Sequence, residues 1–188
     1  MIKTGLKIAW GITGSGDYME ESISLMKRIS NEDDVDIKVF LSKSGEQVVR
    51  WYKLWESLEE SFPNLSVEKG PNTPFIAGQV QIGKFDLLLI CPSTGNTTAK
   101  IACGIADTLV TNTVSQAMKG RVPVYIYPVD QNKGDVVTSL PDGKELTLTM
   151  REVDIENVER IKKMNNIFVI KDVSEIEEIV KSFKEGNK

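Results

Sequence analysis

Short apolar runs alternate with longer amphipathic stretches along most of the 188-residue chain. Four runs of seven mostly apolar residues predict strands at 6–12, 35–41, 85–91 and 122–128. Apolar residues at helical spacing predict helices over about 17–29 and 45–62, a short helix over 75–83, and one or two helices over 98–120. Because strands that alternate with helices favour a parallel sheet covered on both faces, we expect a three-layer α/β/α, doubly wound domain of Rossmann-like or flavodoxin-like type.

The last third of the chain has a different pattern. A Pro-Asp-Gly turn separates two strand-like pieces within 138–150, which predicts a small hairpin inserted after the strand at 122–128. A helix opened by Asp154, a last strand at 166–170 and a closing helix over 172–186 follow, and the spacing of Asp172 and Glu175 predicts a capping arrangement. Without a repeat or a shift in composition, residues 1–188 are expected to form one domain.

Composition and charge exclude several classes of function. Basic residues number 23 against 27 acidic ones, the net charge is −4, and the basic residues are scattered, so a nucleic-acid partner is disfavoured. The N-terminal apolar run is too short for a spanning helix and has no cleavage pattern, which favours a cytoplasmic protein without a membrane partner. The chain has no histidine, the most common general base and metal ligand, so we expect no metal site. Cys91 and Cys103 are expected to be small, buried hydrophobic residues.

Small polar residues follow three of the predicted strands. The loop after 6–12 contains Gly14, Ser15 and Gly16, which suits a phosphate, but the same loop also suits a tight turn capped by Ser15 or Asp17. Ser42 follows the second strand, where a helix cap is the simpler interpretation. Positions 93–98 after the central strand are all small, hydroxyl or amide residues. Because the carboxyl ends of parallel strands meet at one edge, the three loops together predict one binding crevice.

Three motifs resemble a known family. "GITGSG" (11–16), "LSKSGE" (41–46) and "CPSTGNTTAKIACGIADTLVTN" (91–112) are similar to segments of the flavoprotein family that includes homo-oligomeric flavin-containing cysteine decarboxylases, phosphopantothenoylcysteine decarboxylases and flavin prenyltransferases. The resemblance covers most of the first 130 residues. The later "YPVDQNKG" (127–134) and "LPDGKELTLTMREVDIENVE" (140–159) resemble archaeal flavoproteins reduced by ferredoxin and archaeal-type dihydromethanopterin reductase.

The resemblance implies FMN, bound without a covalent link at a subunit interface of a homo-oligomer. It places the phosphate end at the first loop and the isoalloxazine and ribityl portions along the central loop. Lys100 would stabilise reduced, anionic FMN or remain a solvated or interface cation, and Asp107 would tie its helix to a loop. The implied cofactor-binding set is Gly14, Ser15, Gly16, Ser42, Ser93, Thr94, Gly95, Asn96, Thr97 and Lys100, with Asp130 and Gln131 as further candidates at a flavin edge or substrate.

Departures from the family pattern change the expected chemistry. The histidine and the Pro-x-Met-Asn segment of the decarboxylases are absent, and "PVDQN" (128–132) stands where that segment would be. The arginine that the prenyltransferases place after the fifth strand is also missing. We therefore expect an FMN redox protein that accepts electrons from ferredoxin and passes them to an acceptor or reductase. An acceptor-dependent dihydromethanopterin reductase remains an alternative, as does a non-redox binding subunit resembling the flavoprotein-fold half of dipicolinate synthase. No catalytic residue is assigned.

One predicted helix, 45–62, carries several residues of uncertain role. Trp51 and Trp55 are expected to share a face of it, for core or oligomer packing, as a hydrophobic lid over the flavin, or as a docking face for a partner. Since ferredoxins are generally acidic, basic residues near the crevice are candidates for docking the donor. They are Lys43, Arg50, Lys53 and Lys100.

Overall fold

Six parallel strands form the centre of the computed structural model, which describes residues 5–32 and 34–186. The strand order is β3-β2-β1-β4-β5-β8, and every neighbouring pair runs parallel. The order runs outward from β1 in both directions, so the sheet is doubly wound, as predicted. The strands are β1 (Leu6–Ile12), β2 (Val35–Leu41), β3 (Ser66–Val67), β4 (Leu87–Ser93), β5 (Val124–Pro128) and β8 (Ile167–Val169).

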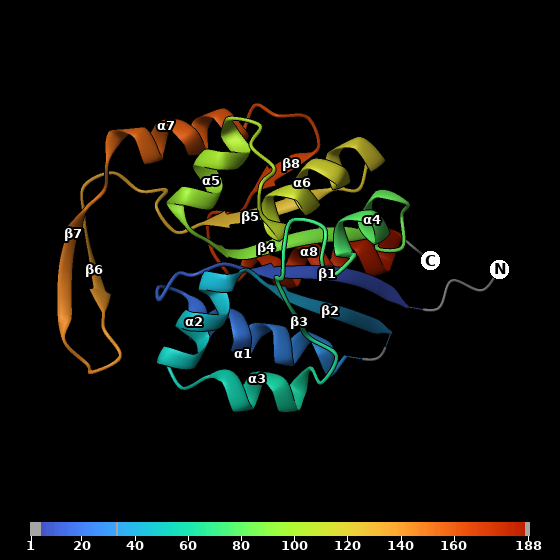
Figure 1. Ribbon diagram of the computed structural model, residues 1–188, viewed down its shortest axis with the longest axis horizontal. Coiled ribbons are helices and arrows are strands. Elements are labelled where there is room, and N and C mark those ends of the chain that lie inside the picture. The colour runs from blue at the N-terminus through green and yellow to red at the C-terminus, as the bar shows by residue number, and fades with distance from the viewer. Residues whose placement is uncertain (1–4, 33, 187–188) are drawn as a thin grey trace.

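Helices cover both faces of this sheet, which confirms the three-layer α/β/α arrangement (Figure 1). The central strand shows the two layers directly, because Leu87 and Leu89 belong to one core cluster while Leu88 and Ile90 belong to the other. The first cluster is completed by α1 (Met19–Ser30), α2 (Lys43–Trp51), α3 (Trp55–Ser61) and α8 (Glu175–Gly186). The second is completed by α4 (Ile76–Gln81), α5 (Gly95–Ala102), α6 (Leu109–Gly120) and α7 (Glu152–Ile161).

The prediction of one helix over 45–62 is wrong, because the chain forms α2 and α3 with a turn between them. The N–H of Leu54 donates to the carbonyl of Val49 at 3.0 Å, and Lys53 takes the left-handed conformation at φ 59°, which closes α2. Trp51 and Trp55 consequently lie on different helices. Trp51 is 60% exposed, so it is not a core residue, whereas Trp55 packs at the core edge beneath the Arg50 guanidinium, 3.7 Å from its ring centroid.

The predicted hairpin follows the fifth strand and consists of β6 (Asp135–Ser139) paired antiparallel with β7 (Glu145–Thr149). It extends away from the sheet on one side of the molecule (Figure 1). Among the residues that the structure describes, two hydrogen bonds attach it to the sheet-and-helix body: the Thr138 hydroxyl donates to the Asp17 carboxylate, and the Tyr52 hydroxyl donates to the carbonyl of Ser139 at 3.0 Å. The hairpin is therefore held against the loop after β1.

The starts of α7 and α8 and the two cysteines match the expectations from the sequence only in part. The N–H of Asp172 donates to the Glu175 carboxylate at 3.1 Å, as the capping spacing predicted, but α7 begins at Glu152 rather than Asp154. Cys91 is buried, and burial raises the pKa of its thiol to about 12. Cys103 is exposed, which contradicts the expected burial, because it lies at the solvent-facing end of α5. No helix of the described residues is long and apolar enough to cross a membrane.

Candidate functional site

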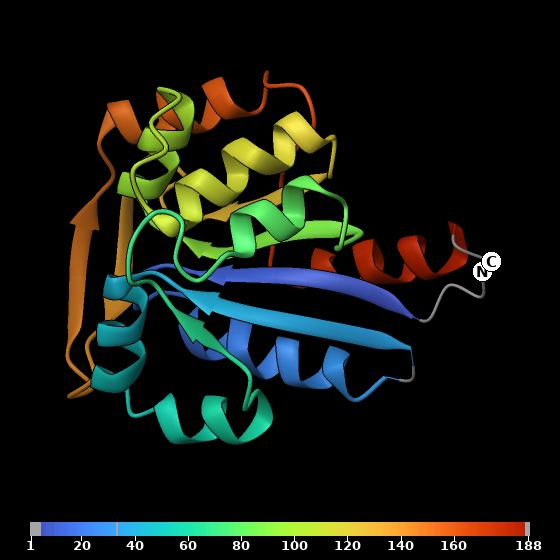
Figure 2. The same ribbon diagram turned by 45° about the vertical axis from the view of Figure 1, so that its right-hand side comes forward.

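The loops after β1, β2, β4 and β5 meet at one edge of the sheet, on the side that carries the hairpin (Figure 2). The Thr13 hydroxyl joins the first and central loops, since it donates to the carbonyl of Pro92 at 2.8 Å and accepts from the N–H of Thr94 at 2.9 Å. The N–H of Val129, after β5, donates to the carbonyl of Ser93 at 3.0 Å. The predicted crevice loops are thus physically connected.

In the first loop, Gly14 and Gly16 are needed for close packing. A Cβ on Gly14 would lie 2.7 Å from the Cβ of Ser44, and one on Gly16 would overlap the Tyr52 hydroxyl. Within the described residues, no group accepts a hydrogen bond from the N–H of either glycine, and the Ser15 hydroxyl has no partner. No side chain of the described residues caps α1, so the cap by Ser15 or Asp17 that the alternative interpretation included is wrong.

The second loop starts α2. Ser42 caps this helix by accepting the N–H of Gly45 at 2.9 Å, which is the simpler role that its sequence position suggested. Its hydroxyl proton remains available for a ligand. The N–H and hydroxyl of Ser44 have no partner among the described residues. Three donors therefore lie at the N-terminus of α2, where the helix dipole favours an anion: the hydroxyls of Ser42 and Ser44 and the N–H of Ser44.

A buried acid that sequence reasoning missed joins α2 to α6. The carboxylate of Glu68, only 9% exposed, accepts the N–H of Lys43 at 3.3 Å and the N–H of Leu109 at 3.2 Å. These are the first residues of the two helices. Glu68 follows a strand of two residues, so no periodic signal in the sequence could have indicated it.

The central loop uses most of its polar groups internally. Thr94 caps α5 by accepting the N–H of Thr97, and the two threonine hydroxyls are 3.1 Å apart. The buried hydroxyl of Ser93 lies 3.2 Å from that of Thr98. Asn96 differs, because it is exposed and neither its N–H nor its side-chain amide has a partner in the described part of the chain. Asn96 is therefore the member of this loop best placed to meet a ligand.

Lys100 and Gln131 are also engaged within the protein. The Lys100 ammonium contacts both carboxylate oxygens of Asp107 at 2.9 Å, and this hydrogen bond lowers the pKa of Asp107. Asp107 lies in the loop between α5 and α6, so this pair ties the loop to α5, as expected of a structural link between helix and loop. The side-chain amide of Gln131 donates to the carbonyl of Ile170 at 3.1 Å, which fastens the loop after β5 to the end of β8.

Asp130 lies directly against the start of α5. Its carboxylate accepts the N–H of Gly95 at 3.0 Å. Asp154, which was not among the predicted site residues, approaches the same side of Gly95 and forms a bidentate ion pair with Arg151 at 2.7 and 2.8 Å. Burial, followed by the negative charge of Asp154, raises the pKa of Asp130. Glycine is therefore required at position 95 by packing, because the two acids leave no room for a side chain there.

The donors left without partners at this edge define what the site can hold. Among the described residues, the neutral ones are the N–H groups of Gly14, Gly16, Ser44 and Asn96, the hydroxyls of Ser15 and Ser44, and the amide of Asn96. Such donors at two helix N-termini fit a phosphate together with the polar rim of a flat ring. In the described residues, no group of three or more Cys, Asp or Glu side chains could hold a metal ion.

The family model described as Flavoprotein matches residues 2–186. The chain belongs to the flavoprotein family. An uncharacterized protein of Methanocaldococcus jannaschii is 54% identical over 93% of this flavoprotein and 94% of the relative. The dihydromethanopterin reductase (acceptor) of the same organism is 38% identical over 88% of the chain and 71% of the relative. Among solved structures, Burkholderia xenovorans DmrB in complex with FMN, described as a cubic protein cage for redox transfer, has a TM-score of 0.83 at 27% identity and 98% coverage of both chains.

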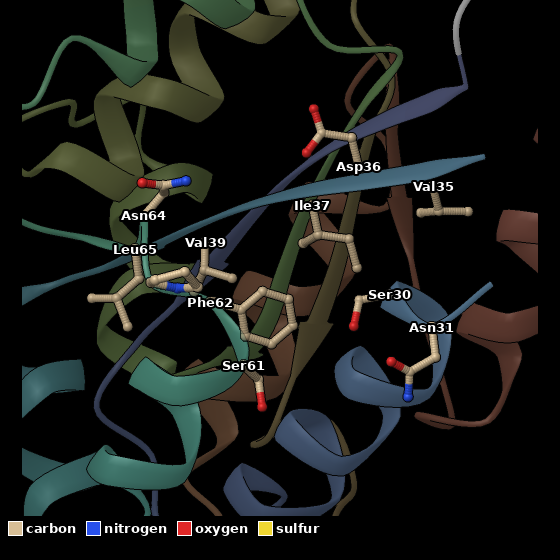
Figure 3. Close-up of a pocket in the computed structure, with 11 residues that line it drawn as sticks. Ser30, Asn31, Val35, Asp36, Ile37, Val39, Ser61, Phe62, Asn64 and Leu65 are labelled. Carbon is tan, nitrogen blue, oxygen red and sulfur yellow. The ribbon is translucent and has the colours of Figure 1, made fainter. Parts of the chain in front are cut away.

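The flavoprotein also has a surface cavity of about 300 Å³ away from these loops (Figure 3). It lies beside the first half of β2, where Val35, Ile37 and Val39 face the ends of α1 and α3. Phe62 forms part of its wall. None of the predicted site residues lines this cavity, so its presence does not alter the location of the candidate site.

Proposed function

We propose that this flavoprotein binds FMN at the carboxyl edge of its sheet and works as an electron carrier or reductase. The bound cofactor supplies redox chemistry that can link a one-electron donor to a two-electron acceptor. Membership of the family and similarity to DmrB, a protein solved with FMN, support the choice of cofactor. The observation that carries the assignment is the set of neutral donors without partners at the starts of α2 and α5.

We assign the phosphate end to the first two loops. The N–H groups of Gly14 and Gly16 and the hydroxyl of Ser15 would donate to the phosphate, together with Ser42 and Ser44. Neutral donors are well suited to this task because they add no charge that must be compensated when the site is empty. The acid nearest this loop, Asp17, is engaged by Thr138 of the hairpin.

We assign the ring to the central loop, with Asn96 as its principal side-chain donor. Ser93, Thr94 and Thr97 would support the ring through the shape of the loop, because their hydroxyls bond within it. Lys100 would act at longer range, since Asp107 balances its charge. Gln131 would position the loop after β5.

Absorbance of the purified protein tests the cofactor assignment. A yellow protein that releases FMN on denaturation, or an apoprotein that takes up FMN in a titration, is the expected result. A colourless chain without affinity for FMN would refute the redox assignment and favour a binding subunit of the dipicolinate synthase type.

We further propose ferredoxin as the electron donor. Of the four basic candidates, Arg50 pairs with Glu46 and Lys100 pairs with Asp107. Lys43 and Lys53 are exposed and have no ion pair among the described residues. Because the chain carries a net charge of −4, an acidic donor needs such a local pair of cations beside the flavin loops.

Charge reversal at Lys43 and Lys53 tests the donor. Reduction by ferredoxin should slow at low salt, while FMN content and reduction by dithionite stay unchanged. Reversal of two other exposed lysines, Lys163 just after α7 and Lys181 within α8, is the matched control and should have little effect. Ready reduction by NADH, with no reduction by ferredoxin at any salt concentration, would contradict the carrier assignment and indicate a nicotinamide-dependent flavin reductase.

A second candidate is an acceptor-dependent dihydromethanopterin reductase. The 38% identity to a relative of that name favours it. Addition of dihydromethanopterin to the reduced protein under anaerobic conditions separates the two candidates. Stoichiometric reoxidation of the flavin with formation of the reduced pterin supports the reductase, whereas a flavin that stays reduced supports a carrier with another acceptor.

We also propose that the flavin site is completed at an interface between copies of the chain. DmrB is described as a cubic cage, and this chain exposes large apolar side chains, among them Phe75 at 72%, Ile82 at 70% and Trp51 at 60%. Native mass spectrometry of the FMN-loaded protein tests this proposal. A monomer that retains full FMN affinity on dilution would refute it.

A further inference from the structure

Two acids and one glycine meet at the start of α5. A Cβ built on Gly95 would lie 2.5 Å from Asp130 Oδ2 and 3.1 Å from Asp154 Oδ1. One oxygen of each carboxylate therefore lies close to the same point beside the backbone of the central loop. The N–H of Gly95 donates to Asp130 at 3.0 Å, so Asp130 is linked to the proposed flavin loop by one hydrogen bond.

The two acids are held differently. Asp154 is 5% exposed and its two oxygens are occupied by the guanidinium of Arg151. Asp130 is half-buried, and its one hydrogen bond among the described residues is the neutral one from Gly95. The charged groups that act on Asp130 are Asp154 and Arg151 of α7 and Asp17 of the first loop.

This environment makes the charged form of Asp130 costly. Burial and the charges of Asp154 and Asp17 raise its pKa, whereas the Gly95 N–H and Arg151 oppose the increase. Because Arg151 is engaged by Asp154, it compensates the charge of Asp130 only in part. Additional negative charge placed beside the start of α5 would favour the protonated form further.

We propose that Asp130 is a proton-accepting positioning residue that couples the redox state of the flavin site to pH. The inference rests on the proposed function. Two electrons reach the site from two molecules of a one-electron donor, and the carboxylate of Asp130 takes one proton from water. No covalent bond forms or breaks at Asp130 other than the O–H bond to this proton, and the residue acts through the Gly95 N–H and through its charge.

The reduction potential of the bound flavin as a function of pH tests the proposal. Uptake of one extra proton per two electrons makes the reduction potential fall with rising pH more steeply, by about 30 mV per pH unit, over one segment of the curve. This steep segment should lie between the pKa of Asp130 in the oxidised protein and its higher pKa in the reduced protein. Asp130→Asn, which keeps an acceptor for Gly95, should lose the segment.

Glu159→Gln is the matched control, because it removes an exposed acid from the same helix that carries Asp154. It should keep the steep segment. Asp154→Asn frees Arg151 to compensate Asp130 and should move the segment to lower pH. An FMN-loaded Asp130→Asn protein with the wild-type pH dependence would overturn the proposal.

A measurement on the wild-type protein keeps the test decisive if Asp130→Asn fails to fold or to hold FMN. Carboxyl ¹³C NMR should give a higher pKa for Asp130 in the reduced protein than in the oxidised one. An equal pKa in the two states overturns this inference alone. A wild-type protein that takes up no FMN overturns the proposed function, and this inference with it.

Discussion

Gly95→Ala should destabilise the apoprotein, because the new methyl group would stand where Asp130 now lies. The Cβ would be 2.5 Å from Asp130 Oδ2, closer than real side chains approach, so the carboxylate must move and release the N–H of Gly95. A hydrogen bond to a charged group contributes about 1.5–3 kcal/mol. The higher helix propensity of alanine returns at most about 1 kcal/mol, and less at the first residue of a helix. The expected net loss is about 1–2 kcal/mol.

Urea unfolding of the apoprotein measures this loss, with Gly78→Ala as the matched control. Gly78 lies within α4, and a Cβ there would meet nothing within 4 Å, so alanine should stabilise by about 0.5–1 kcal/mol. In an Asp130→Ala background, Gly95→Ala should cost much less, because its steric conflict is gone. If Gly95→Ala is as stable as Gly78→Ala, the close packing of Asp130 against Gly95 is wrong.

Three further predictions concern the candidate site. Asn96→Ala should weaken FMN binding by about 0.5–1.5 kcal/mol, the usual contribution of a neutral hydrogen bond, and unchanged affinity in a titration of the apoprotein would contradict the placement of the ring. Ser15→Asp should give a folded protein without flavin, because a carboxylate repels the phosphate. Ser24→Asp on α1 is the control, and a yellow Ser15→Asp protein would place the phosphate elsewhere. Folding raises the pKa of Asp130, so the wild-type apoprotein should lose stability relative to Asp130→Asn as pH rises from the unfolded-state pKa through the folded-state pKa. Urea unfolding measures the difference in free energy of unfolding between the two proteins. A difference that does not change with pH would contradict the prediction.

The longer strands and their parallel, doubly wound arrangement were predictable because they depend on local pattern, whereas the two-residue strand β3 was not predicted. A run buried on both faces, such as Leu87–Ile90, has no amphipathic alternation, and parallel crossovers require the helices that the sequence showed between strands. The break between α2 and α3 was not predictable in the same way. It depends on a left-handed Lys53, where glycine or asparagine would have been the usual signal.

The contacts that Glu68 and Asp130 make at the candidate site lay beyond sequence reasoning for a different reason. Glu68 bonds the starts of helices 25 and 41 residues away along the chain, and Asp130 bonds Gly95 across 35 residues. These contacts produce no periodic pattern in the sequence, because each depends on where strands end in space. The sequence makes Asp130 a candidate for touching the flavin or substrate directly, whereas in the structure its carboxylate accepts the N–H of Gly95 in the central loop.

The run of small polar residues at 93–98 illustrates how such a loop should be interpreted. A helix that begins at a strand end must first satisfy its own N–H groups, and Thr94 and Asp130 perform that task for Thr97 and Gly95. Ser93 and Thr98 bond to each other inside the core edge. What remains for a ligand is the residue that the fold does not use, Asn96. The resemblance to flavoproteins located the segment, but only the hydrogen bonds separate the groups that build the loop from the group that is free to bind.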